Sequence, residues 1–492
     1  MSFHSLLAAA ILWFAVPAFA TPQPIDATDL WYNPAESGWG VSVFHQGDTL
    51  FASLFVYGPD AQPKWYTASG LTPGPFTFSG PLVESHGPWF GERFDSDDVQ
   101  RRVVGSMTFT LSGNTANVSY DIDGIRVSKP VVRASLRTIN VAGPYYGVLL
   151  QPASVSGAEV AILDRHILLS DDGSTLSMDM ASNRFPSGCF FRGEARSQNG
   201  EIVNASGATG AACTSSSGPW RMSVDPTPHG FVGNFSGGGI NDGRIAAASR
   251  DAPRLQGSGW ANDLWFRGDS PGWGLNFIEQ GDSAFATLFV YDAQRRPRWY
   301  SASQLRAMGI VDGWPTWSGT LEESTGPYFG GPFDPSQVKR RAVGTMTFSV
   351  DPFGPSDSGR IAYTIDGVSV SSNVDRFGFR KNDMTGSYQG HVVMRSDDPR
   401  GLSYDDATFT IDDRQGLATM TINIDTGPTC TFTSSVKQYG SQLAMAGTCA
   451  GGTQVIITDL VVTANGFTGT YSGPAGHIGG LITKGHISGA RR

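Results

Sequence analysis

Apolar and polar residues alternate along much of this chain, and short glycine-containing turns interrupt the alternation. From Val118 to Val127 apolar residues occupy every second position on either side of Asp123-Gly124. A period of two predicts a strand with one buried face, and Asp-Gly between two such runs predicts a type I′ hairpin. The same pattern returns from Ile361 to Val370 around Asp366-Gly367. Many short strands joined by tight turns are therefore expected.

Three departures from simple alternation refine this expectation. The segment Phe51–Tyr57 is apolar on both faces, which predicts a strand covered on both sides. Asp334-Pro335 is a helix-start signal, so we expect a helical turn running to Arg341, with a counterpart from Asp95 to Arg102. Further hairpin turns are expected at two Asn-Gly pairs, Asn199-Gly200 and Asn465-Gly466.

The chain contains a long internal repeat. Asp29–Ser69 aligns without a gap to Asp263–Ser303, at an offset of 234, with 20 of the 41 positions identical. The match continues beyond a five-residue insertion, and a weaker repeat that carries two cysteines follows each copy. This gives the order A1-B1-A2-B2. The expected boundaries are a signal peptide at 1–20, A1 at 21–140, B1 at 141–250, a linker at 251–258, A2 at 259–382 and B2 at 383–492.

The fold class expected from these patterns is all-β, a tandem duplication of a two-module unit. Each A module has room for about seven or eight strands, which suits a small antiparallel β-barrel or a β-sandwich. Hydrophobic residues make up 40% of the chain and charged residues 16%, a composition that excludes disorder. The net charge is −9 and Lys and Arg form no run, which excludes sequence-independent binding of nucleic acid.

The first twenty residues resemble an export signal. An apolar stretch, Leu6–Val16, precedes the small-x-small trio Ala18-Phe19-Ala20, so we expect cleavage after Ala20. The alternative is a short buried apolar segment. No later stretch approaches the roughly 18 apolar residues of a membrane span. The expected location is therefore the periplasm or the extracellular medium, with no transmembrane span.

Four cysteines fit an oxidising compartment. None lies near a second cysteine at metal-ligand spacing. The duplication favours one bridge in each B module, Cys189–Cys213 and Cys430–Cys449, over the other pairings and over four free thiols. Each bridge would stabilise the fold by about 3 kcal/mol in the chain-entropy model.

The start of each A module resembles a repeat found in uncharacterised exported bacterial proteins. The residues that carry the resemblance are Trp31 to Gly40 (WYNPAESGWG), Gln46-Gly47-Asp48 and Pro63-x-Trp65. A2 departs from the pattern at Arg267–Pro271. The resemblance implies export and a module boundary, and it implies no chemistry.

Candidate catalytic residues are few. The motif Gly268–Gly272 has the Gly-x-Ser-x-Gly spacing of a serine hydrolase, but a strand is expected after it where a nucleophile elbow requires a helix. No two histidines have the spacing of metal ligands, so no metal and no cofactor are predicted. Among acids present in both A copies, Glu84 and Glu323 have no turn or cap role. They are the candidate acids of a hydrolase, although no catalytic residue is assigned.

The aromatic residues that recur in both A modules are the candidates for ligand binding. Trp and Tyr faces stack on sugar rings, and the alternative is that these residues fill the core. Trp39 and Trp273 have glycine on both sides, which favours an exposed platform. The predicted ligand-binding residues are Trp39, Trp65, Tyr66, Arg101, Trp273, Trp299, Tyr300 and Arg340.

These patterns favour a non-enzymatic exported binding or surface-interaction protein with two equivalent A sites, whose expected partner is a glycan or a cell-envelope polymer. One alternative is a polysaccharide-acting hydrolase of the cell envelope that uses Glu84 and Glu323. Another is a structural component of the envelope or matrix.

Overall fold

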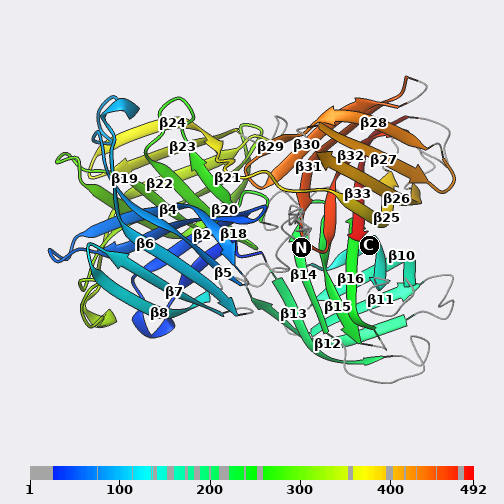
Figure 1. The fold of residues 1–492 in the computed structure, drawn as a ribbon, viewed down its shortest axis with the longest axis horizontal. Coiled ribbons are helices and arrows are strands. Elements are labelled where there is room, and N and C mark those ends of the chain that lie inside the picture. The colour runs from blue at the N-terminus through cyan, green and yellow to red at the C-terminus, as the bar shows by residue number, and fades with distance from the viewer. Residues whose placement is uncertain are drawn as a thin grey trace, which may run out of the picture.

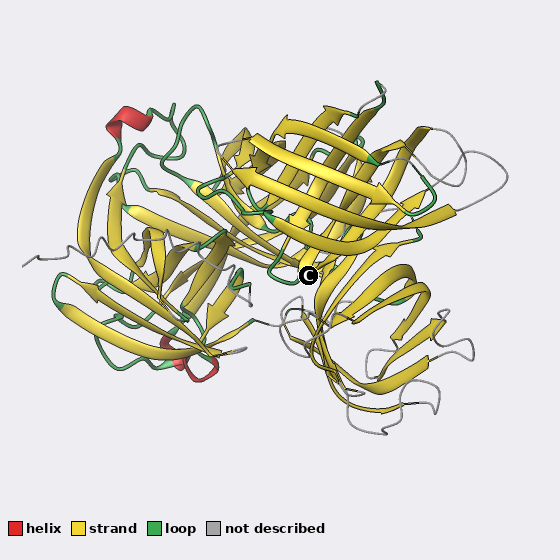
Figure 2. Cartoon of the chain, turned by 45° about the vertical axis from the view of Figure 1, so that its right-hand side comes forward, coloured by secondary structure: helices red, strands yellow, loops and turns green. Residues whose placement is uncertain are grey.

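The described part of the chain is all-β, and its strands form four antiparallel sheets (Figures 1 and 2). The structure is a computed structural model that describes residues 26–74, 76–112, 115–134, 136, 141–151, 160–171, 175–181, 189–198, 201–209, 221–237, 240–251, 259–352, 358–394, 403–414, 417–427, 429–449, 452–474 and 481–492. The expected signal peptide and all but residue 251 of the expected linker lie outside these ranges. No helix within the described ranges is long and apolar enough to span a membrane.

Each A module is a closed barrel of eight strands. The A1 strands are β1 (Asp29–Tyr32), β2 (Gly40–Gln46), β3 (Thr49–Tyr57), β4 (Pro63–Gly74), β5 (Thr77–His86), β6 (Gln100–Ser112), β7 (Thr115–Ile122) and β8 (Ile125–Arg133). The A2 strands are β17 (Asp263–Phe266), β18 (Gly274–Gln280), β19 (Ser283–Tyr291), β20 (Pro297–Val311), β21 (Trp314–Thr325), β22 (Lys339–Val350), β23 (Ser358–Ile365) and β24 (Val368–Arg376).

The B modules differ in closure. B1 is a closed barrel of β9 (Gly143–Gln151), β10 (Val160–Asp171), β11 (Thr175–Ala181), β12 (Cys189–Gln198), β13 (Glu201–Thr209), β14 (Arg221–Thr227), β15 (Gly230–Gly237) and β16 (Ile240–Ser249). B2 is a nine-stranded sheet of β25 (Gly386–Met394), β26 (Ser403–Arg414), β27 (Leu417–Ile424), β28 (Cys430–Ser435), β29 (Lys437–Tyr439), β30 (Gln442–Thr448), β31 (Gln454–Val462), β32 (Gly466–Pro474) and β33 (Leu481–Arg491). The sheet is not closed, because β28 and β29 are its two edges.

The predicted A-module hairpins have the expected turn geometry. Asp123 and Gly124 have φ values of 50° and 84°, and Asp366 and Gly367 have values of 46° and 83°. Two successive positive φ values define a type I′ turn, so both predictions are confirmed. Asn465 lies in the turn between β31 and β32 and Gly466 begins β32, while Asn199-Gly200 lies outside the described residues.

The predicted helical turns are much shorter than expected. The 3-10 turn η3 covers only Pro335–Gln337, and η2 covers Ser96–Asp98. The capping prediction holds, because the side chains of Asp334 and Asp95 accept hydrogen bonds from the backbone two residues later. The turns end early because the following residues join the sheet, where Lys339 pairs with Thr325. A third turn, η1, covers Pro34–Glu36.

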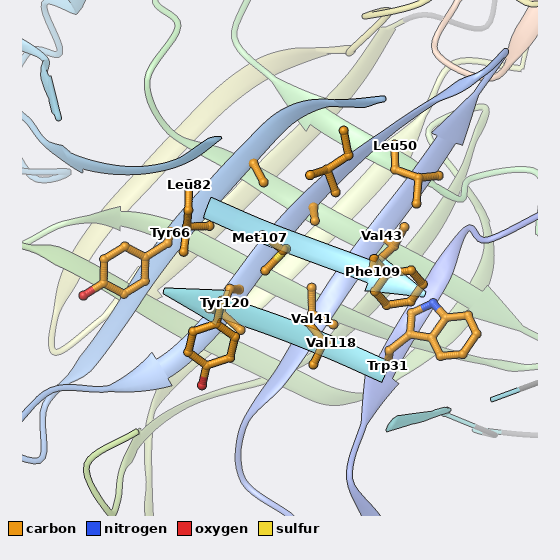
Figure 3. Close-up of a cluster of buried hydrophobic side chains, with 14 of the residues drawn as sticks. Trp31, Val41, Val43, Leu50, Tyr66, Leu82, Met107, Phe109, Val118 and Tyr120 are labelled. Carbon is orange, nitrogen blue, oxygen red and sulfur yellow. The ribbon is translucent and has the colours of Figure 1, made fainter. Parts of the chain in front are cut away.

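The inward faces of the strands fill the A barrels with apolar side chains. In A1, Trp31 packs edge-on against Phe109, with ring centroids 5.1 Å apart (Figure 3). Strand β3 is buried along its whole length, as expected. Its outward face is covered by the A2 barrel, where Phe55 lies beside Phe289 and Trp299.

The two A barrels therefore pack side by side, with the B modules beyond them (Figure 1). Nearly equivalent hydrogen bonds cross between the barrels. The indole of Trp65 donates to the carbonyl of Val290 at 3.1 Å, and that of Trp299 donates to Val56 at 3.2 Å. B1 and B2 also make contact, because Tyr146 stacks on Tyr404 at 4.0 Å between centroids.

A loop from each A barrel enters the other one. The β5–β6 loop of A1 carries Phe90, which packs with the A2 core against Tyr300. The β21–β22 loop of A2 carries Phe329, which is part of the A1 core. Gly87, at the start of the first loop, must be glycine because a Cβ there would lie 2.5 Å from the ring of Tyr291. We call these segments the exchange loops.

The repeated Gln-Gly-Asp motif also joins the two halves. The amide of Gln46 in A1 donates to the carbonyl of Phe377 and accepts from the backbone of Phe379, both at 2.9 Å, in the segment between A2 and B2. Gln280 in A2 makes the matching contacts with Ala134 and Leu136 after A1. The glutamine of each A module is thus hydrogen-bonded to the segment that follows the last barrel strand of the other A module.

One of the two predicted disulfides is observed. Cys430 on β28 is bonded to Cys449, directly after β30, so the bridge joins two strands that are not neighbours in the B2 sheet. The predicted partner of Cys189, Cys213, lies outside the described residues.

Candidate functional site

The two tryptophans expected to form exposed platforms are buried. Trp39 is 6% exposed and Trp273 is 8% exposed, and each belongs to the core of its barrel. The indole of Trp39 also donates to Glu36 at 3.1 Å. The expected exposure is therefore wrong for both residues.

The flanking glycines do not leave the tryptophans exposed, because side chains of the other copy occupy the space beside these glycines. A Cβ at Gly38 would lie 2.6 Å from the side chain of Val338 in A2, and one at Gly272 would lie 2.8 Å from that of Val99 in A1. These glycines allow the exchange loop of the other barrel to approach closely. Sequence neighbours of Trp39 cannot reveal this contact.

The other predicted aromatic residues are buried as well. Trp65 and Trp299 form the contact between the A barrels, at 2% and 5% exposure. Tyr66 and Tyr300 line the barrel interiors beneath the exchange loops, at 2% and 6% exposure. A ligand-binding role for these four side chains stays a prediction, and stacking on them would require the barrels to separate or the loops to withdraw.

The predicted arginines Arg101 and Arg340 are exposed at the starts of β6 and β22. Each exerts an electrostatic effect on a tyrosine of the other copy, Arg101 on Tyr291 and Arg340 on Tyr57. The following arginine in each pair, Arg102 or Arg341, makes the more extensive contacts.

Arg102 joins two carboxylates at one end of the A1 barrel. Its guanidinium donates to Glu84 at 2.8 Å and to both oxygens of Asp123 at 2.5 and 2.8 Å. The pairing of β5 with β6 places Glu84 opposite Arg102, and the type I′ turn after β7 presents Asp123.

The same arrangement recurs in A2. Arg341 donates to Glu323 at 2.8 Å and to both oxygens of Asp366 at 2.6 and 2.9 Å. Glu84 and Glu323, the two candidate acids, therefore occupy equivalent positions, each bound to an arginine.

These contacts lower the pKa of three of the carboxylates, Glu84, Asp123 and Asp366. Burial raises the pKa of Glu84, but the hydrogen bond from Arg102 and the charges of Lys64 and His86 outweigh burial, so its pKa is below the ordinary value. The hydrogen bond from Arg102 likewise lowers the pKa of Asp123, and that from Arg341 lowers the pKa of Asp366. A general acid of a glycosidase requires the opposite, a raised pKa.

The exchange loop of the other copy carries a half-buried aromatic ring to the end of each barrel where the carboxylate pair lies. Tyr328, next to Phe329 in the exchange loop, is half-buried over the A1 barrel. Phe329 packs against Tyr66, which pairs with Glu84 on the neighbouring strand, so the loop reaches the end of the barrel that holds Glu84. The same loop contacts the Asp123 hairpin, because a Cβ at Gly330 would lie 2.8 Å from Ile125.

In A2 the equivalent ring is Trp89, which is half-buried. The centroids of the Trp89 and Phe90 rings are 5.8 Å apart. Phe90 packs against Tyr300, which pairs with Glu323 on the neighbouring strand. Each barrel end thus holds three charged groups of its own copy, and the exchange loop of the other copy, with its half-buried ring, reaches that end. We name these groups the A1 rim site (Glu84, Arg102, Asp123 and Tyr328) and the A2 rim site (Glu323, Arg341, Asp366 and Trp89).

The rim sites offer recognition chemistry. A half-buried ring provides a stacking face, and the paired charges provide directional hydrogen bonding. Within the described ranges, no three His, Cys, Asp or Glu side chains are placed to hold a metal ion.

Sequence reasoning missed Trp89 and Tyr328, although a signal for them exists. Both copies contain Gly-Pro-aromatic-Phe-Gly, at Gly87–Gly91 and Gly326–Gly330. The variable aromatic is the rim residue and the constant phenylalanine is the one that enters the other barrel.

Comparisons with known proteins assign no family to this chain. No family model and no curated protein matches it. Among solved structures it is similar to the isotype 1 transferrin binding protein B from serogroup B Neisseria meningitidis, at 10% identity and a TM-score of 0.17, over 89% of this chain and 88% of that one. A likeness of this size carries no argument about function.

Proposed function

We propose that this protein is an exported, non-enzymatic binding protein that holds a glycan or another cell-envelope polymer at its two rim sites. The observation that carries the proposal is a carboxylate–arginine–carboxylate group at the barrel end that receives an exchange loop with a half-buried aromatic ring, in both A modules. Sugars are bound by this combination of a stacking face and directional polar groups.

Two quasi-equivalent sites on one chain favour a repeating ligand. A polymer that occupies both sites binds more tightly than one site allows, because the second contact is intramolecular. The export part of the proposal rests on residues 1–20, which have the order of a signal peptide.

The charge state of Glu84 argues against the hydrolase alternative. Its lowered pKa leaves it ionised at neutral pH, and the second carboxylate of the site, Asp123, is ionised too. Neither residue of this pair is therefore a proton donor to a leaving group.

A binding screen with the mature protein (residues 21–492) tests the proposal. Polysaccharides and envelope polymers would be presented to the wild type and to a Trp89→Ala, Tyr328→Ala double variant. Phe76→Ala is the matched control, because Phe76 is an aromatic residue, 52% exposed, outside the rim sites.

We expect the wild type and the control to bind the same polymer, and the double variant to bind it at least about tenfold more weakly. Equal binding by the double variant, or no binding by any protein, would count against the proposal. Release of new reducing ends would instead support the hydrolase.

A further inference from the structure

The two rim sites differ around the glutamate. In A1 the Nζ of Lys64 lies 3.5 Å from Glu84, and the Nε2 of His86 lies 3.7 Å from it. At the matching positions A2 has Arg298, whose guanidinium donates to Asp292 at 3.0 Å, and the uncharged Thr325. Lys64 and His86 are thus features of A1 alone.

The A1 groups are arranged in two layers. The Glu84 side chain is 10% exposed, whereas the side chains of Lys64, His86 and Arg102 are 30%, 43% and 55% exposed. The carboxylate of Glu84 is therefore largely buried, and the basic side chains that contact it are exposed to solvent. In A2 the carboxylate of Glu323 is more exposed, at 23%, and Arg341 is its partner.

On the basis of the proposed function, we infer that the A1 rim site binds the acidic groups of an anionic polysaccharide, while the A2 rim site binds uncharged parts of the chain. A carboxylate on the ligand would contact the exposed atoms of Lys64 and His86, with Tyr328 against the sugar ring. The exposed acid at this site, Asp123, is bonded to Arg102 through both oxygens, which reduces its repulsion of the ligand.

Another charge near His86, that of Arg295, is already paired. Gly87, next to His86, donates its N–H to the carbonyl of Arg295, and the guanidinium of Arg295 is bonded to Asp98. Lys64 and His86 are the basic groups beside Glu84 that the matching positions of A2 do not place beside Glu323.

The test compares two forms of one polymer, polygalacturonate and its fully methyl-esterified form, in which each charged carboxylate is replaced by an uncharged methyl ester. Their affinities would be measured at low salt for the wild type, for a Lys64→Gln, His86→Thr double variant that carries the A2 residue at position 86, and for Arg306→Gln. The last variant removes an exposed charge on the β20 hairpin, outside both rim sites, and controls for net charge.

We expect the wild type and Arg306→Gln to bind the acid form about tenfold more tightly than the ester, and the double variant to bind both forms equally. Unchanged ester binding by the double variant shows that it is folded. Persistence of the acid preference in the double variant, or equal binding of both forms by the wild type, overturns the inference.

Failure of the inference is distinguishable from failure of the proposed function. Binding of the ester without preference for the acid contradicts the inference and leaves the proposed function standing. Binding of neither form, together with a negative polymer screen, contradicts both.

Discussion

The ring of Phe329, from the second half of the chain, packs against the ring of Tyr66 in the first A barrel, at 6.4 Å between centroids. In the other barrel, Phe90 lies against Tyr300 at 6.3 Å. Each A core is thus completed by a side chain of the other copy. The duplication is therefore one interlocked pair of barrels rather than two independent modules.

Removal of a ring from an exchange loop should destabilise the barrel that receives it. Because Phe329 is 8% exposed within the A1 core, we expect Phe329→Ala to lower the free energy of unfolding by about 3 kcal/mol. Urea denaturation followed by tryptophan fluorescence would measure this. Phe76→Ala, which removes an exposed ring, should change stability by less than about 0.5 kcal/mol. Equal effects of the two variants would show that the loop does not complete the core.

The contact of Gln46 with the A2–B2 connection is testable separately. Gln46→Ala leaves the carbonyl of Phe377 and the N–H of Phe379 without their side-chain partner, at a cost of about 1–3 kcal/mol. Hydrogen exchange should therefore accelerate at Phe379 and Arg380. In Gln304→Ala, which removes an exposed glutamine, exchange at these amides should not change.

The ion pair of Glu84 predicts a pH-dependent contribution to stability. The folded pKa of Glu84 is lowered, so its contribution is present above the ordinary pKa of about 4.5 and is lost as pH falls through the folded value. Glu84→Gln should therefore be less stable than the wild type at pH 7, by about 1–2 kcal/mol for a partly buried pair.

Thermal unfolding of both proteins between pH 2 and pH 7 would measure the difference. It should shrink as the solution becomes more acidic than pH 4.5 and approach zero near pH 2. A difference that stays constant across this range would show that the charge of Glu84 does not stabilise the fold.

Because the disulfide Cys430–Cys449 spans an open part of the B2 sheet, its loss should affect B2 in particular. The bridge closes a loop with a sequence separation of 19, for which the chain-entropy model gives about 3 kcal/mol. Cys430→Ala, Cys449→Ala should lower the unfolding temperature of B2. Hydrogen exchange in β27 and β31 should accelerate while exchange in β3 does not. Acceleration in β3 as well would contradict a local effect.

Local patterns in the sequence predict local structure well here. Alternation around Asp123-Gly124 is enough to predict a hairpin, because the turn geometry depends on the turn residues themselves. Asp334 similarly predicts a cap, but the length of the turn depends on strand pairing of the residues after Gln337, which the cap does not specify.

Contacts between the copies explain the errors in the predicted site. The glycines that flank Trp39 predict an exposed ring, but the ring is buried, and Val338 in the exchange loop of A2 fills the space beside Gly38. The rim sites combine residues about 200 or more positions apart, such as Arg102 and Tyr328. A repeat makes such sites hard to predict, since each motif can contact its own copy or the other.

The number of ligands bound by each variant tests the central claim most directly, because each rim site takes its aromatic ring from the opposite copy. Isothermal titration with a short oligosaccharide of the polymer identified in the screen should give two sites per chain for the wild type. Tyr328→Ala and Trp89→Ala should each retain one site, and the double variant should retain none. Two remaining sites in both single variants would contradict the account.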